Sequence, residues 1–178
     1  FAFYGKELHG AEAQPPRWRL AMDITSEILG EAVGKAYVER YFPPETKRAV
    51  EAMVHNLIAA FGRRIDGLTW MSPATKARAK EKLATLKIGV GYPDVWKDYT
   101  GLSVVRGDAF GNRERAELFE YQRNVKKLGR PVDRGEWVME PQLVDAVNLP
   151  VRNAMNFPAA ILSPPFFDPR STAAANYA

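Results

Sequence analysis

The 178-residue sequence contains no cysteine. This absence excludes disulfide bonds, thiolate metal ligands and cysteine nucleophiles, and it leaves the redox compartment of the protein unassigned. Any catalytic or metal-binding chemistry would therefore depend on histidine, carboxylate or hydroxyl side chains.

Histidine is also scarce, with only His9 and His55. Glu51 lies four residues before His55, a spacing that would place two ligands on one face of a helix. Both histidines fall opposite apolar positions, so we interpret them as solvent-facing residues. The sequence has no H-E-x-x-H, G-x-S-x-G, P-loop or G-x-G-x-x-G motif. We therefore predict no catalytic residue and no metal ligand in this chain.

Long apolar runs and a strong excess of one charge are missing as well. The sequence has no stretch of 18 apolar residues, so we expect no membrane segment, and no basic and apolar leader indicates a signal peptide. The net charge is +4 with 21 acidic residues, a balance that does not favour nucleic acid as a partner. The chain begins with Phe rather than Met, from which we expect a processed or excised piece.

Apolar periodicity predicts helices over most of the first 130 residues. The first helix opens at Pro16 and contains Gly30 and Gly34, which indicate close packing or a break. A third helix begins with Ser72 as its cap, and a fourth runs from near Asp108 to Gly129. The second helix has the clearest apolar face, formed by Val50, Met53, Val54, Leu57, Ile58, Phe61, Ile65 and Leu68.

Strand signals are short and lie late in the chain. Residues 102–105 predict one strand, and the alternation around "LVDAVN" predicts a hairpin over 143–157 with its turn at Pro150. The stretch "NFPAAILSPPFFDP" (156–169) is apolar and rich in proline, so we expect neither a helix nor a central strand there. The predicted fold is mainly α, with a helical bundle-like region over 1–130 and a short β hairpin within 131–178.

Two clusters of basic residues invite a functional interpretation. We interpret both as solvated helix faces in preference to binding sites for an anionic partner. The clusters are Lys76, Arg78, Lys80 and Lys82, and Arg123, Lys126, Lys127 and Arg130.

Several blocks of the sequence resemble the neprilysin family of metallopeptidases, which includes endothelin-converting enzymes and bacterial oligopeptidases. The blocks are "WRLAMDITSEILGEAVGKAYVERYFPPETK", "LTWMSPATKARAKEKLATLKIGVGYPD", "RPVDRGEWVMEPQLVDAVN" and "NFPAAILSPPFFDP". They occur in the family's order and spacing and cover nearly the whole chain. The lack of cysteine is more similar to the bacterial members than to the disulfide-rich animal ones.

The resemblance implies a fragment of a larger, two-lobed, zincin-like peptidase that hydrolyses oligopeptides with zinc. In the family, a sequence like "NYA" leads into an H-E-x-x-H helix that binds the zinc, and this chain stops at Ala178 before any such helix. The resemblance thus implies that zinc belongs to the parent protein, that the remainder of the catalytic domain is this chain's partner, and that the chain alone is inactive. It favours a periplasmic or secreted location over a cytoplasmic one.

The resemblance also implies a substrate-binding wall. In the family, an Asn-Ala-aromatic edge strand pairs with the bound peptide. Counting back from Phe157 places this motif at Asp145, Ala146 and Val147, so the sequence departs at the Asn and at the aromatic position. A literal Asn-Ala-Met begins at Asn153, but it lies too near Phe157, and we favour Asp145.

Ile161 and Phe166 match family positions that line the apolar pocket for the residue after the scissile bond. Ordinary core packing is the equal alternative for both side chains. A different class of function stays open at this point, namely a non-catalytic helical binding module that recognises an acidic partner through its basic faces.

Overall fold

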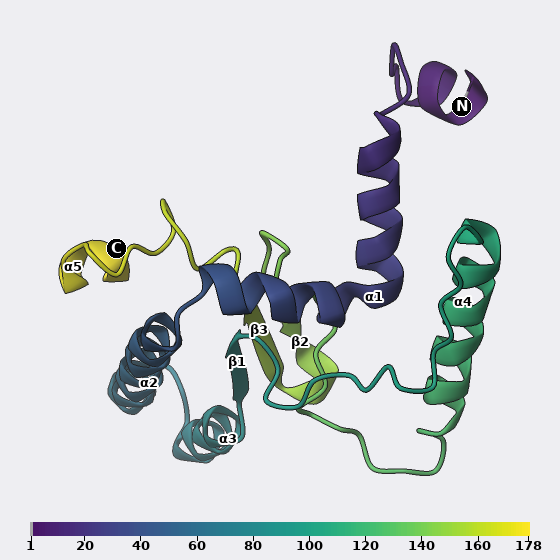
Figure 1. Ribbon diagram of the computed structural model, residues 1–178. Coiled ribbons are helices and arrows are strands. Elements are labelled where there is room, and N and C mark those ends of the chain that lie inside the picture. The colour runs from purple at the N-terminus through teal and green to yellow at the C-terminus, as the bar shows by residue number, and fades with distance from the viewer. Residues whose placement is uncertain (1) are drawn as a thin grey trace.

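The computed structural model describes residues 2–178, in which helices surround one small sheet (Figure 1). This arrangement confirms a mainly α fold with a β hairpin near the C-terminal end. The helices are η1 (Ala2–Leu8, a π-helix), α1 (Arg17–Tyr41), α2 (Pro44–Gly67), α3 (Pro73–Ala84), α4 (Ala109–Val125), η2 (Pro150–Arg152, a 3-10 turn) and α5 (Ala173–Tyr177). The strands are β1 (Lys87–Gly91), β2 (Val147–Leu149) and β3 (Ala154–Pro158).

The cap predicted at Ser72 is present, and Asp108, near which the fourth helix was expected to start, also caps its helix. The Ser72 hydroxyl accepts a hydrogen bond from the Thr75 amide at 3.2 Å, and the Asp108 carboxylate accepts one from the Gly111 amide at 3.0 Å. Each cap satisfies a backbone donor that the first turn of a helix leaves unpaired. Helix α4 ends at Val125, earlier than expected, and turns then lead to Gly129, whose φ is 73°.

Helix α1 bends sharply at Leu29, which has non-helical φ and ψ of −123° and 27° (Figure 1). Directly after the bend, Gly30 and Gly34 are buried. A Cβ at Gly30 would lie 2.3 Å from Cγ of Glu140, and one at Gly34 would lie 2.5 Å from Cδ of Pro141. Both interpretations of the glycines, a break and close packing, are therefore confirmed.

The sheet has the strand order β1-β3-β2. Strand β1 runs parallel to β3 with Gly89 opposite Asn156, and β2 runs antiparallel to β3 with Val147 opposite Asn156. Strand β1 escaped the sequence analysis because its glycines are typical of turns. Gly89 is required by the fold, since a Cβ there would lie 2.8 Å from the Trp137 ring.

The strand predicted at 102–105 is wrong. The side-chain amide of Asn112 accepts from the Val105 amide at 2.7 Å and donates to the Val105 carbonyl at 2.8 Å. These two bonds replace those that a neighbouring strand would supply, and Val104 is 61% exposed.

The expectation that 156–169 avoids a central strand is also wrong at its start. Asn156, Phe157 and Pro158 complete β3, which lies between the other two strands. Pro158 is tolerated because the pairing with β2 ends at Asn156, so its missing N–H faces no strand. The rest of the stretch is irregular, as predicted.

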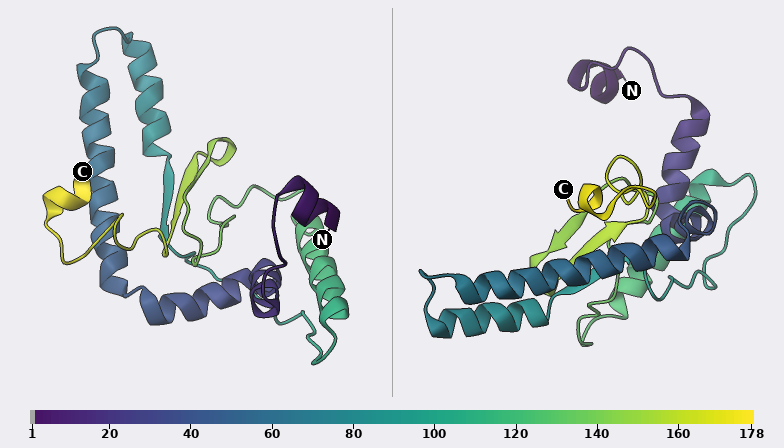
Figure 2. Two further views of the ribbon diagram at one scale, coloured as in Figure 1. Left: turned by 90° about the horizontal axis from the view of Figure 1, so that it is seen from above. Right: turned by 90° about the vertical axis from the view of Figure 1, so that its left-hand side faces the viewer.

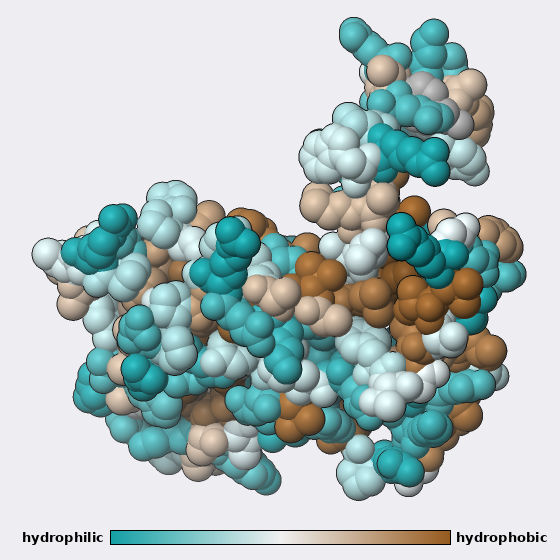
Figure 3. Space-filling model, in the orientation of Figure 1, coloured by the Kyte–Doolittle hydropathy of each residue, from teal (hydrophilic) through white to brown (hydrophobic). Residues whose placement is uncertain are grey.

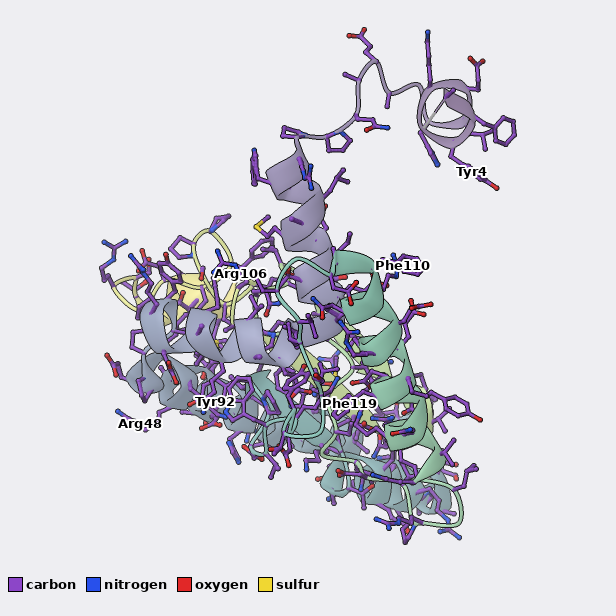
Figure 4. The ribbon with its side chains drawn as sticks, turned by 45° about the vertical axis from the view of Figure 1, so that its right-hand side comes forward. Tyr4, Arg48, Tyr92, Arg106, Phe110 and Phe119 are labelled. Carbon is purple, nitrogen blue, oxygen red and sulfur yellow. The ribbon has the colours of Figure 1, made fainter. Side chains whose placement is uncertain are left out.

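Two small apolar clusters hold the helices to the sheet. One joins Val38 and Phe42 near the end of α1 to Ala159, and the other joins Val50 of α2 to Val90 of β1 and Phe167. Tyr92 packs on the first cluster, beneath the second half of α1 (Figure 4). Helices α2 and α3 lie side by side and extend away from the sheet as a helical hairpin (Figure 2).

Candidate functional site

Strand β2 forms an open edge of the sheet, and the hydrogen bonds show which of its backbone groups are unused. The Lys87 amide donates to the Asn153 carbonyl at 3.0 Å, and the Ala159 amide donates to the Gly91 carbonyl at 2.8 Å. Backbone groups alternate in direction along a strand, so the odd-numbered residues of β3 face β1. Ala154 and Asn156 therefore face β2.

The same alternation applies to β2. Val147 and Leu149 lie opposite Asn156 and Ala154, so they form the hydrogen-bonded pairs of the antiparallel ladder. The N–H and C=O groups of Ala146 and Asn148 consequently point away from the sheet. Both residues are exposed. The edge can accept one further strand.

Asp145 lies immediately before this edge and is exposed. Its Oδ1 accepts a hydrogen bond from the Ala146 amide at 2.7 Å. The carboxylate thus occupies one of the two outward N–H groups. Asp145, Ala146 and Val147 are brought together as a continuous edge, as their sequence order requires.

Ile161 and Phe166 lie in the irregular segment after β3. Ile161 is half-buried in the turn that follows Pro158, whereas Phe166 is 65% exposed and its neighbour Phe167 is only 4% exposed. Within residues 2–178, no hydrogen bond joins this segment to Asp145, Ala146 or Val147. The second apolar cluster takes Phe167 rather than Phe166.

The turn between β2 and β3 is held by Arg134. Its guanidinium donates to the carbonyls of Arg152 at 2.8 Å, Asn153 at 3.0 Å and Thr85. Asn153 has the left-handed φ of 46°, and its Nδ2 donates to the Lys82 carbonyl at 2.9 Å. One arginine and one asparagine therefore fix the hairpin to the C-terminal end of α3, whose last carbonyls would otherwise be unpaired.

On its other side the turn is held by Glu136. This carboxylate accepts from Arg123 at 2.7 Å, from Lys127 and from Arg152 at 3.5 Å. Burial acts to raise the pKa of Glu136, but hydrogen bonds from Lys127 and Arg123 outweigh it and lower the pKa below its ordinary value. The prediction of a solvated face at Arg123 is wrong, because its side chain is only 31% exposed and bridges Glu136 and Glu120.

The remaining basic cluster largely follows its prediction. Arg78 pairs with Glu81, and both side chains are well exposed at 82% and 62%. Lys80 pairs with Asp66 of α2 at 2.9 Å, and Lys76 donates to the Asp66 carbonyl at 2.7 Å. These contacts fasten α3 to the end of α2.

Metal ligands do not gather anywhere in residues 2–178, where no group of three or more His and acidic side chains could hold an ion. His55 is exposed, and its Nδ1 lies 2.8 Å from the Glu51 carbonyl. The described helices also include none that is long and apolar enough to cross a membrane.

The sequence analysis did not predict the hydrogen bonds and ion pairs by which Arg134 and Glu136 hold the hairpin in place. Backbone carbonyls accept from Arg134 whatever their side chains are, so no motif marks them. A signal did exist for β1, since Ile88 and Val90 alternate with glycines at the strand period.

A family model described as "Peptidase family M13" matches residues 1–93. Human "Neprilysin" is 33% identical over 182 residues, which cover 98% of this chain and 24% of that protein. "Neprilysin-3" of Drosophila melanogaster is 32% identical, over 97% of this chain and 23% of that protein. The chain thus spans about a quarter of the length of the relatives it matches.

Solved structures give the same result. The zinc metalloprotease Zmp1 of Mycobacterium tuberculosis, in complex with an inhibitor, matches with a TM-score of 0.88 and 44% identity, over 99% of this chain and 26% of that one. PepO of Lactobacillus rhamnosis matches with a TM-score of 0.82 and 34% identity, over 97% of this chain and 28% of that one.

Proposed function

Because this chain belongs to peptidase family M13, the neprilysin family of metallopeptidases, we propose that the full-length protein is a zinc-dependent endopeptidase of oligopeptides. In this proposal the chain supplies helical scaffold and one wall of the peptide-binding site. The observation that carries the second part is the open edge of β2, with the backbone groups of Ala146 and Asn148 directed outward. An extended peptide would add to this edge as a further strand.

Asp145 would set the chemistry of that edge. A neutral Asn side chain both donates and accepts, whereas an ionised carboxylate only accepts. Oδ1 of Asp145 is already engaged by the Ala146 amide. Arg152, the nearest cation along the turn, pairs with Glu136 instead, and in residues 2–178 no ion pair neutralises Asp145. The carboxylate is therefore available to a basic residue or an amide of the peptide and repels a carbonyl.

Ile161 and Phe166 would form the apolar part of the wall. Phe166 suits this role better than core packing, because its ring is 65% exposed. A large exposed apolar side chain beside a rigid, proline-rich turn can contact a ligand with little loss of conformational entropy. Ile161 is half-buried, so only part of its surface is available to a ligand.

The zinc ion and its ligands would come from outside this chain. Residues 2–178 hold no suitable group of ligands, so we assign no metal-binding residue here and derive no catalytic step from this chain. Its own residues would bind and orient the peptide.

The remainder of the protein would cover the exposed apolar faces. The chain exposes 12846 Å², whereas a compact protein of 20.0 kDa exposes about 8,700 Å². The excess is of the size that an obligate interface buries. Apolar side chains gather on the surface over α4 and the adjoining part of α1 (Figure 3). The exposed apolar residues of α4 include Phe110, Leu118 and Val125.

The activity is tested on the full-length protein with an internally quenched neutral oligopeptide. We expect cleavage of an internal bond, its loss with a chelator and its recovery with zinc. Activity that persists in chelator would contradict the proposal.

The edge strand is tested separately with Asp145→Asn. Replacing the carboxylate removes a repulsion that costs roughly 1 to 3 kcal/mol, so kcat/KM for a neutral peptide at neutral pH rises by roughly 5- to 150-fold. The wild type gains relative to the variant on a basic peptide. If kcat/KM of the two forms coincides on both a neutral and a basic peptide, Asp145 does not touch substrate, and Asn148 becomes the candidate.

A further inference from the structure

A network of partly buried charged side chains next to the hairpin contains more cations than carboxylates. Four cations, Lys97, Arg123, Lys127 and Arg152, share two carboxylates, Glu120 and Glu136. The side chains of all six are less than half exposed, from 17% for Glu136 to 45% for Lys127. These six side chains carry a net charge of +2, and the carboxylates of Glu31 and Glu140 also line the pocket beside the four cations.

The network opens into a cleft of about 740 Å³. This volume is typical of a ligand site. The cleft lies between the segment 94–97, the C-terminal end of α4 and the segment 130–137, and Trp96 and Trp137 form its apolar walls.

Three more cations line the cleft: Lys87, Lys126 and Arg130. None of them forms an ion pair with a residue of 2–178. In total seven cations and four acidic residues line the cleft, an excess of three, whereas the whole chain has an excess of four. Glu120, which lies outside this lining, pairs with Lys97 and Arg123, and the cleft together with Glu120 still has a net positive charge.

Of the four acidic residues of the cleft, only Glu136 forms ion pairs with the cations that line it. Asp94 pairs with Lys47 at 3.6 Å, Asp133 accepts from the Gly135 amide at 2.8 Å, and Glu31 accepts from the Lys97 amide at 2.7 Å. Glu136 is shared by three cations. A concave surface with a net positive charge attracts anionic ligands.

We propose that this cleft binds an acidic peptide segment through at least two of its carboxylates. The cations are spread along the cleft on β1, on the turn after α4 and on the β2–β3 turn, which suits charges distributed along an extended chain. A phosphate group is held at a helix N-terminus or by converging backbone amides. Here the cleft meets the C-terminal end of α4. Guanidinium groups held in place by Glu136 are suited to carboxylates.

The inference goes beyond the proposed peptidase activity and does not depend on it, because binding can be measured without catalysis. The experiment uses the full-length protein in chelator, with hexaglutamate as the probe and hexaglutamine as the neutral control. Binding is followed by calorimetry and by the fluorescence of tryptophan, since Trp96 and Trp137 line the cleft. We expect hexaglutamate to bind, with an affinity that falls as salt is added, and hexaglutamine not to bind.

The variant Lys126→Gln with Arg130→Gln removes two exposed cations of the cleft. We expect hexaglutamate affinity to fall by roughly three- to tenfold. The matched control, Arg63→Gln with Arg64→Gln, removes the same charge from exposed positions at the far end of α2, and its affinity stays within about twofold of the wild type.

Equal losses of hexaglutamate affinity in the two double variants would show that net charge alone attracts the probe. This result would overturn the proposal that the cleft is the binding site. Failure of hexaglutamate to bind, or binding of inorganic phosphate in its place, would overturn the peptide assignment. Melting temperatures establish that each variant is folded, and Lys87→Gln replaces the double variant if the latter is unstable.

Discussion

The two halves of helix α1 differ both in composition and in surroundings. Before the bend at Leu29, Trp18 is 67% exposed and Met22 is 53% exposed, and this half buries no residue. After the bend, Gly30, Gly34 and Val38 are buried against the segment 140–142 and the sheet. Figure 4 shows the first half leading away from the rest of the molecule toward η1, which carries Tyr4.

This difference shows that burial in this chain depends on what a segment meets and not on how apolar it is. The half with large apolar residues stays open, whereas the half with two glycines is the one that packs. Glycine allows the helix backbone to approach Glu140 and Pro141, and this approach brings the segment before β2 against the helix. The position of the candidate peptide-binding edge therefore depends on the second half of α1.

The largest effect is expected at Gly34. In Gly34→Val, new side-chain atoms would overlap Pro141, because even a Cβ would lie 2.5 Å from its ring. We expect a loss of about 3 kcal/mol in the free energy of unfolding, measured by urea denaturation. Ala21→Val, in the exposed half of α1, is the matched control and costs less than about 1 kcal/mol. Equal losses at the two positions would remove the distinction between the halves.

The second-largest loss of stability is expected for Val50→Ala, which removes buried methyl groups from the apolar cluster that joins α2 to β1. Val50 is only 2% exposed, and we expect a loss of about 2 kcal/mol. Val104→Ala removes the same atoms from a side chain that is 61% exposed and changes stability by less than about 0.5 kcal/mol. The measurement is the urea midpoint of both variants. A loss of unfolding free energy at Val104 similar to that at Val50 would show that the exposed loop is packed as tightly as the core.

Arg134→Lys tests whether the hydrogen bonds of Arg134 stabilise the β2–β3 hairpin. Lysine keeps the charge but replaces the planar fork that donates to three carbonyls. We expect a loss of about 1 kcal/mol and faster amide hydrogen exchange in 147–158. Exchange in the α2–α3 hairpin provides the internal control. Unchanged exchange in 147–158 would mean that the hairpin holds its position without Arg134.

The smallest effect concerns pH. The pKa values of Glu120 and Glu136 are lowered by the hydrogen bonds of their basic partners, which outweigh burial. A lowered pKa in the folded state contributes stability above the ordinary value of 4.5 and loses it as pH falls below that value. In Glu136→Gln we expect the free energy of unfolding at pH 7 to fall by about 1 kcal/mol or less. We also expect this free energy to decrease less steeply as pH falls below 4.5 than it does in the wild type. The same decrease of unfolding free energy with falling pH in the variant and the wild type would contradict the lowered pKa of Glu136.

Local chemistry explains which elements were predictable. Ser72 and Asp108 cap their helices through their own side chains, so short-range sequence patterns are sufficient to find them. The helix starts and the β2–β3 hairpin follow from the same kind of signal. The failures have tertiary causes. The glycines of β1 accommodate Trp137 and Phe42, which lie far away in the sequence, and Asn112 takes the place of a strand beside Val105.

The candidate site was less accessible to sequence reasoning than the fold. Asp145, Ala146 and Val147 were found through family resemblance, and their position at an open edge became visible only with the register of β2. The basic cleft was missed because Arg123, Lys126, Lys127 and Arg130 are typical of a solvated helix face. Their role depends on Arg152 and Lys87, which only the fold brings close to them.

The central claim is that a peptide adds to β2 through the outward backbone groups of Ala146 and Asn148. The most direct measurement is residue-resolved hydrogen exchange of the full-length protein, with and without a slowly cleaved peptide ligand. The account predicts that the ligand slows exchange at the amide of Asn148, while Val147 and Leu149, already bonded to β3, and Ala146, already bonded to Asp145, change little. Equal protection along the whole edge, or no protection at Asn148 with the site saturated, would contradict it.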